Sequence, residues 1–173
     1  MRKTINCFIP YEENTAIDKV VTALKDSIVV NKIYLLTTAH GSMPSVPAGC
    51  EPFTIDSLNS SDTIKKIAQK ADTPFTLLYT KASPFELGYM ALERIADFLQ
   101  DRKTGMVYAD HYEWKEGEKK KHPAIDYQPG SVRDDFDFGA LLAFRSEYLN
   151  GAAGMMEHER EEYRSAGLYP TRL

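Results

Sequence analysis

The sequence contains little cysteine, no long apolar run and no large excess of either charge. Its two cysteines, Cys7 and Cys50, are not part of a CxxC pair, which argues against a disulfide framework. Its longest apolar runs, such as residues 33–36 and 140–144, are far shorter than the roughly 20 residues of a membrane-spanning helix. A net charge of −4 attracts neither nucleic acid nor an anionic membrane. We therefore expect a cytoplasmic protein with no transmembrane segment in this chain and no nucleic acid as a partner.

Four strong sequence motifs are also missing. The chain has no GxxxxGK[S/T], GxGxxG, HExxH or GxSxG segment. These absences exclude the common nucleotide triphosphatases, dinucleotide enzymes, zinc proteases and α/β-hydrolases.

The composition is that of an ordinary globular domain. In 173 residues, 43% are hydrophobic and 27% are charged, which favours one domain over residues 1–173. The sequence stops inside what looks like a further element, so we leave open that the domain is truncated at its C-terminal end.

Strand and helix patterns alternate along the chain. Runs of β-formers predict strands over residues 4–9, 28–38, 53–55, 75–79 and 106–114. Stripes at helical spacing predict intervening helices that begin at Asn14 or Thr15, at Ser60, and at Ser83 with Pro84 as the first helical residue. The buried face expected for the third helix comprises Leu87, Ala91, Ile95 and Phe98. The pattern predicts an α/β fold: a three-layer, Rossmann-like, mainly parallel sheet.

In such a sheet, ligands bind beyond the carboxyl ends of the strands. The sequence therefore predicts one site formed by residues 10–14, 37–40, 79–83 and 109–112. A polar turn at residues 116–117 predicts a hairpin that leaves the sheet.

The order of these segments resembles the family-2-type glycosyltransferases, whose GT-A domain binds a nucleotide-sugar. Residues 8–14 look like the family's first strand and nucleotide loop, and residues 33–38 look like its second strand. Residues 73–81 look like the strand that leads to its metal-binding Asp-x-Asp. Residues 105–112 look like a later Tyr-Ser-Asp strand, and residues 137–145 look like the strand beneath the acceptor site. The resemblance implies a GT-A-type fold. It also implies a glycosyltransferase of polysaccharide biosynthesis, which moves a sugar from a nucleoside diphosphate sugar to a saccharide or lipid-linked acceptor.

The sequence departs from the family at two acidic positions. Thr37 and Thr38 replace the acidic pair after the second strand, and residues 79–81 read Tyr-Thr-Lys in place of Asp-x-Asp. Mn²⁺ or Mg²⁺ on a diphosphate needs hard anionic oxygen ligands, which tyrosine and lysine do not supply. Lys81 either replaces the charge of the metal, together with the helix expected to begin at Ser83, or is a solvated residue.

The resemblance and the strand ends together give the candidate site. The predicted nucleotide-sugar contacts are Pro10, Tyr11, Glu12, Thr37, Thr38, Lys81 and Asp110. Asp110 is also a candidate for a metal contact, and its alternative role is to cap a turn.

The acceptor side is expected at Asp135 and Asp137, the one literal Asp-x-Asp. In a strand their carboxylates would share a face and could bind a cation or position an acceptor hydroxyl, whereas the structural alternative is an ion pair with Arg133. No carboxylate lies in residues 165–173, where the resembled family has its base. Glu161 and Glu162 lie upstream, and no residue is assigned as the catalytic base.

Two further interpretations stay open. The chain is alternatively a catalytically silent GT-A-like binding module of a larger protein, or a sugar-1-phosphate nucleotidyltransferase. Trp114 with Tyr108, Tyr112 and Tyr127 forms either an aromatic platform for a sugar ring or a hairpin that packs on its own aromatic side chains.

Overall fold

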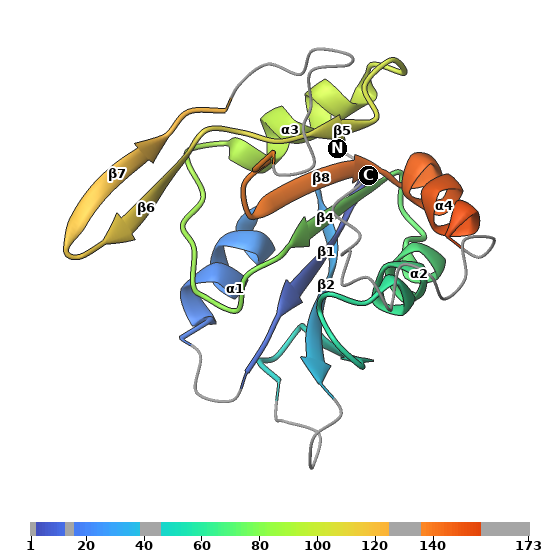
Figure 1. Ribbon diagram of the computed structural model, residues 1–173, viewed down its shortest axis with the longest axis horizontal. Helices are drawn as coiled ribbons and strands as arrows, with labels where there is room; N and C mark the ends of the chain where they lie inside the picture. The colour runs from blue at the N-terminus through green and yellow to red at the C-terminus, as the bar shows by residue number, and fades with distance from the viewer. Residues whose placement is uncertain (1–2, 13–15, 39–45, 125–135, 157–173) are drawn as a thin grey trace.

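The computed structural model describes residues 3–12, 16–38, 46–124 and 136–156 (Figure 1). Its strands are β1 (Ile5–Pro10), β2 (Val30–Thr38), β3 (Glu51–Ile55), β4 (Phe75–Tyr79), β5 (Met106–Val107), β6 (His111–Lys115), β7 (Glu118–His122) and β8 (Leu141–Arg145). Its helices are α1 (Asp18–Asp26), α2 (Ser61–Lys70), α3 (Ala91–Gln100) and α4 (Ser146–Met155). Several residues singled out above lie outside the described part of the chain: Asn14, Thr15, Tyr127, Arg133, Asp135, Glu161 and Glu162.

Six of the strands form one mainly parallel sheet in the order β3-β2-β1-β4-β8-β5. β1 pairs in parallel with β2 and β4, and β2 pairs in parallel with β3. β8 is antiparallel to both β4 and β5, so β5 runs in the same direction as β4. The carboxyl ends of β1, β2, β3, β4 and β5 therefore lie at the same edge of the sheet.

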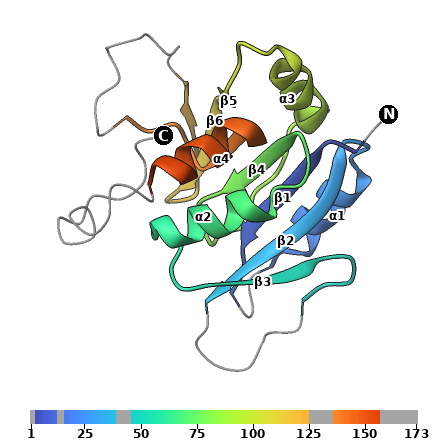
Figure 2. The same cartoon turned by 90° about the vertical axis from the view of Figure 1, so that its right-hand side faces the viewer.

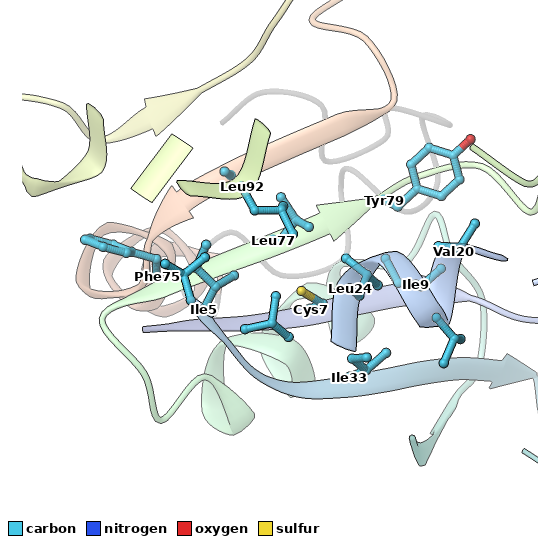
Figure 3. Close-up of a cluster of buried hydrophobic side chains, with 14 of the residues drawn as sticks. Ile5, Cys7, Ile9, Val20, Leu24, Ile33, Phe75, Leu77, Tyr79 and Leu92 are labelled. Atoms are coloured by element: carbon cyan, nitrogen blue, oxygen red, sulfur yellow. The ribbon is translucent and has the colours of Figure 1, made fainter. Parts of the chain in front are cut away.

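Helices cover both faces of this sheet, so the expected three-layer α/β architecture is confirmed. Successive side chains of a strand point to opposite faces, and in β1 Cys7 joins one core while Phe8 joins the other. The core on the Cys7 side is closed by α1 and α3; Figure 3 shows Val20 and Leu24 of α1 and Leu92 of α3 lying against it. The core on the Phe8 side is closed by α2 and α4, which lie side by side (Figure 2).

The second helix begins where the sequence predicts. Ser60 is the N-cap of α2, and its hydroxyl accepts a hydrogen bond from the Asp62 amide at 3.2 Å. The stripe of Ile64, Ile67 and Ala68 is buried. The first helix differs slightly, because its N-cap is Ile17, which makes no side-chain capping bond.

The third helix begins later than expected, and the predicted start at Ser83 is wrong. Met90 has φ 51°, a left-handed conformation that interrupts the helical path directly before Ala91. The buried stripe is Leu92, Ala96 and Leu99, whereas Phe98 is 62% exposed. The apolar residues of this segment offer two overlapping stripes, and packing against the sheet selects the one that excludes Phe98.

The prediction of one strand over residues 106–114 is also wrong, because this stretch forms two separate strands, β5 and β6. β5 pairs with β8 over two residues only, and the chain then leaves the sheet as the β6–β7 hairpin (Figure 1). Glu116 and Gly117, at φ 56° and φ 81°, form the turn of this hairpin. That turn gives residues 111–115 an antiparallel partner close in sequence, so they pair locally and not with the sheet.

Residues 136–139 are not a strand either. Gly139 adopts φ 82°, and its amide donates a hydrogen bond to Asp137 Oδ1 at 2.8 Å. This local turn ends before β8, so the expected strand geometry around Asp137 is wrong. In the described ranges, no helix has the length and apolar character needed to cross a bilayer.

Candidate functional site

The edge of the sheet at which the parallel strands end is the candidate site, and we call it the carboxyl edge. It comprises Tyr11 and Glu12 after β1, Thr38 at the end of β2, Thr80 and Lys81 after β4, residues 108–110 after β5, and residues 137–140 before β8. The amide of Thr80 donates to the carbonyl of Ala140 at 2.9 Å, which joins the segment after β4 to the start of β8.

The junction between β1 and β4 has the geometry that favours a ligand. From its carboxyl end, β1 connects through α1 to β2 on one side, and from its carboxyl end β4 connects through α3 to β5 on the other side. Chain connections that diverge from neighbouring strand ends leave room for a ligand at that point of an α/β sheet. The predicted segments at residues 10–12 and 79–81 therefore lie next to each other at this junction.

The residues after β1 differ in what they offer to a ligand. Pro10 is buried as the last residue of the strand. The amide of Tyr11 donates to the Leu36 carbonyl at 2.8 Å, which fixes the chain direction beyond β1. Tyr11 is half-buried and Glu12 is exposed, so their side chains are at the surface of the edge.

The two threonines at the end of β2 point to opposite faces. Thr37 is buried at 4% exposure, whereas Thr38 is exposed. Thr38 is accordingly the threonine whose hydroxyl solvent or a ligand can reach.

Tyr79 occupies the position at which the resembled family has its first metal-binding aspartate. Its ring is buried and packs on Phe85 with centroids 4.3 Å apart. Its hydroxyl lies 3.0 Å from the Ser83 hydroxyl. This tyrosine therefore closes the core on the α1 and α3 side and holds the loop that follows β4.

Lys81 makes an ion pair with the hairpin. Its Nζ lies 3.3 Å from Glu113 Oε1, with both side chains substantially exposed. The hydrogen bond and positive charge of Lys81 lower the pKa of Glu113 below its ordinary value, with smaller contributions from His122 and Lys115. Because α3 begins at Ala91, the helix N-terminus expected beside Lys81 is absent from this place.

Asp110 lies at the base of the hairpin and is engaged there. Its Oδ1 accepts a hydrogen bond from the Ala124 amide at 2.7 Å, and its Oδ2 lies 3.8 Å from Lys121 Nζ. These contacts connect the entry and the exit of the hairpin. They give Asp110 a structural role at the base of the hairpin.

A histidine pair on the hairpin faces the turn before β8. The rings of His111 and His122 stack at 5.0 Å with an interplanar angle of 9°. His122 Nε2 lies 3.4 Å from Glu113 Oε2. A Cβ atom on Gly139 would lie 3.2 Å from His111 Nδ1, so this glycine allows a close approach of the hairpin. Asp137 is exposed beside it.

The donors at the carboxyl edge do not fit a divalent cation. The position that would face a diphosphate offers a phenol, a hydroxyl and an ammonium from residues 79–81, and Mn²⁺ or Mg²⁺ prefers carboxylate oxygens. Across the described ranges, no group of three or more His, Cys, Asp or Glu side chains could hold a metal ion.

Neither cysteine offers a nucleophile to this edge. Burial raises the pKa of the Cys7 thiol far above its ordinary value and also raises that of Cys50. Both side chains are therefore protonated near neutral pH, whereas thiol chemistry requires the thiolate.

The sequence interpretation missed Glu113 as the partner of Lys81. The sequence did carry a signal for the face on which Glu113 lies. A turn centred on residues 116–117 pairs His111 with His122, and Glu113 then lies on the same face as the two histidines. The alternation of hairpin side chains was sufficient to deduce that face. The contact with Lys81 depends on how the hairpin lies over the sheet, which is a tertiary feature.

No protein-family model matches the sequence, and no curated protein matches it significantly. Among solved structures, it is similar to CMP:2-keto-3-deoxy-manno-octonic acid synthetase complexed with CTP, at a TM-score of 0.45 and 10% identity, covering 98% of this chain and 88% of that one. A likeness this distant does not establish a shared activity.

Proposed function

We propose that the chain binds a nucleoside diphosphate sugar at the carboxyl edge and transfers the sugar to a saccharide or lipid-linked acceptor. The observation that supports this most directly is the meeting of the ends of β1, β2, β4 and β5 at one edge, with the chain connections diverging between β1 and β4. The same segments carry the resemblance to GT-A-type glycosyltransferases.

The proposal gives each side of the edge a role. Tyr11, Glu12 and Thr38 contact the nucleoside, and Lys81 contacts the diphosphate beside the end of β4. Asp110 lies toward the sugar at the base of the hairpin, and Asp137 lies toward the acceptor before β8.

The reaction is a displacement at the anomeric carbon. The bond from that carbon to the diphosphate oxygen breaks with its electron pair, and a bond to the acceptor oxygen forms. The acceptor proton passes to a base, which the proposal leaves unassigned. The ammonium of Lys81 stabilises the negative charge that develops on the leaving diphosphate, and to do so it exchanges Glu113 for phosphate oxygens.

A catalytically silent binding module is the second candidate. It is favoured by the way the charged groups near the edge engage one another, since Lys81 pairs with Glu113 and Asp110 binds the Ala124 amide. In that case the nucleotide binds but no sugar is transferred.

Titration calorimetry tests the binding that both candidates share, and an assay for released nucleoside diphosphate separates them. The chain is titrated with uridine, guanosine and cytidine diphosphate sugars, with and without Mn²⁺, and the binding of the best ligand is repeated with Lys81→Gln. Lys103→Gln is the matched control, because Lys103 is exposed in the turn before β5, at the opposite edge of the sheet.

The proposal expects binding of a nucleoside diphosphate sugar that Lys81→Gln weakens and Lys103→Gln leaves unchanged. Release of free nucleoside diphosphate with an acceptor supports transfer, and binding without release supports the silent module. Release of pyrophosphate from a nucleoside triphosphate would show a nucleotidyltransferase instead. Absence of binding to every nucleotide would overturn the proposal.

A further inference from the structure

The β6–β7 hairpin has two chemically different faces. Its register pairs Tyr112 with Lys121 and Trp114 with Lys119, so these four side chains lie on one face. We call this the aromatic-lysine face. The other face carries His111, Glu113 and His122, which approach Lys81 and Gly139. The aromatic-lysine face consequently points away from those contacts.

This face is open to solvent. Trp114 is 72% exposed and Tyr112 is 57% exposed, and every residue of β7 is exposed. Figure 1 shows the hairpin extending away from the six-stranded sheet. Two strands alone do not form a core, so the aromatic rings on this face contribute little to folding.

The charged side chains that β6 and β7 contribute to the aromatic-lysine face are both lysines. The pairing of Lys115 with Glu118 and of Glu113 with Lys120 places both glutamates of the two strands on the other face. Lys119 Nζ lies 4.5 Å from the centroid of the Tyr112 ring, so an ammonium is held directly above an aromatic surface. Near the hairpin base, Asp110 pairs with Lys121 at 3.8 Å, which leaves Lys119 as the cation beside Trp114.

Flat aromatic rings flanked by ammonium groups fit a ring-shaped anionic ligand. The apolar C–H face of a pyranose packs on indole or phenol, and the lysines attract its carboxylate or phosphate groups. Side chains two residues apart on a strand are about 7 Å apart, so Tyr112 and Trp114 can contact different units of a saccharide chain. We infer that the aromatic-lysine face binds a negatively charged saccharide chain. Its identity as the acceptor rests on the proposed function, whereas the binding itself does not.

Three other occupants fit the hairpin less well. The turn carries Glu116 and is followed by Glu118, which oppose insertion of the tip into an anionic membrane. The net charge of −4 opposes a nucleic acid. Three consecutive lysines on β7 oppose pairing with the same strand of a second copy.

Trp114 is the one tryptophan of the sequence, so its fluorescence reports on this face directly. The probe is a tetramer of galacturonic acid, and its fully methyl-esterified form is the neutral counterpart. The inference expects the acidic tetramer to shift and quench the Trp114 emission in a saturable way, with binding that weakens as salt rises. The neutral tetramer is expected to bind more weakly.

Matched lysine variants locate the charge contribution. Lys119→Gln is expected to weaken binding by up to about fivefold, in line with an exposed charge contact. Lys120→Gln is the control on the opposite face of the same strand and is expected to leave binding unchanged. Trp114→Ala, followed by calorimetry, is expected to weaken binding by about tenfold or more through loss of stacking. Because these side chains are exposed, an unchanged Tm verifies that each variant folds.

The alternative outcomes are distinct. Equal effects of Lys119→Gln and Lys120→Gln, or no saturable response to the acidic tetramer, would overturn the inference. An emission shift with phosphatidylglycerol vesicles but not with the tetramer would assign the face to a membrane, and a shift that depends on protein concentration alone would assign it to a second copy. The proposed function can fail while this inference holds. In that case the chain binds no nucleotide, but it binds the tetramer, and Lys81→Gln leaves that binding intact.

Discussion

The Nζ atom of Lys81 lies 3.3 Å from Oε1 of Glu113, and this contact joins the segment after β4 to the projecting hairpin. The same glutamate lies 3.4 Å from Nε2 of His122 through its other oxygen. A lysine that is proposed to hold a diphosphate is therefore already paired with a carboxylate in the described structure. A ligand at the carboxyl edge has to compete with Glu113 for the ammonium of Lys81.

This competition predicts opposite effects for the two partners. Glu113→Gln frees Lys81 and is expected to strengthen binding of a nucleoside diphosphate by about threefold, the scale of an exposed ion pair. Lys81→Gln is expected to weaken it. Calorimetry on both variants measures the two affinities, and weaker binding by the Glu113→Gln variant would show that Lys81 does not contact the ligand.

The pairing of Glu113 also predicts a pH dependence. Its hydrogen bond to Lys81 and the positive charge of Lys81 lower the pKa of Glu113 below the ordinary value of 4.5. A carboxyl group with a lowered pKa stabilises the folded contact above its unfolded pKa, and this contribution is lost as the pH falls through the folded value. We expect the contact to be complete above about pH 4.5 and to open in more acidic solution. A carbon-detected NMR titration should show the pKa of Glu113 rising toward its ordinary value in Lys81→Gln, and an unchanged pKa would contradict the pairing.

The buried face of α3 predicts a contrast between neighbouring residues. Leu99 is 0% exposed and Phe98 is 62% exposed. Leu99→Ala is expected to lower the free energy of unfolding by about 2–5 kcal/mol through lost burial and a cavity. Phe98→Ala is expected to change it by about 0.5 kcal/mol or less. Urea denaturation of both variants measures the difference. A larger loss of unfolding free energy for Phe98→Ala would show that α3 buries the face expected from the sequence.

The contacts of Asp110 predict a structural effect that a conservative variant rescues. Asp110→Ala removes the acceptor for the Ala124 amide, so that amide should exchange with solvent faster. Asp110→Asn keeps an oxygen acceptor and should keep most of the protection. Hydrogen exchange at Ala124 measures both variants. If Asp110→Asn keeps the protection but loses nucleotide-sugar binding, the charge of Asp110 serves the ligand as well as the hairpin.

The layered sheet could be predicted from sequence because each strand and helix carries its own local pattern. β4 coincides with the predicted residues 75–79, and Ser60 caps α2 as expected. The start of α3 could not be predicted in this way, because the left-handed conformation of Met90 has no sequence signal as strong as a glycine. The face of α3 was missed because apolar residues support two stripes, and only contact with the sheet distinguishes them.

The candidate site was predictable in its location and less so in its contacts. Parallel strands place their carboxyl ends at one edge, so the segments after β1 and β4 could be brought together from the alternation of elements. The burial of Thr37 and the exposure of Thr38 depend on which face each residue meets. The pairing of Lys81 with Glu113 depends on the path of the hairpin, which a single sequence does not encode locally.

The most direct test of the proposed site is an amide NMR titration of the chain with a nucleoside diphosphate sugar. The proposal predicts that saturable shift changes concentrate at Tyr11, Glu12, Thr38 and Lys81, with the amides of α4 and of the turn at residues 101–104 unaffected. Shift changes confined to other surfaces, or none at millimolar ligand, would contradict a nucleotide-sugar site at the carboxyl edge.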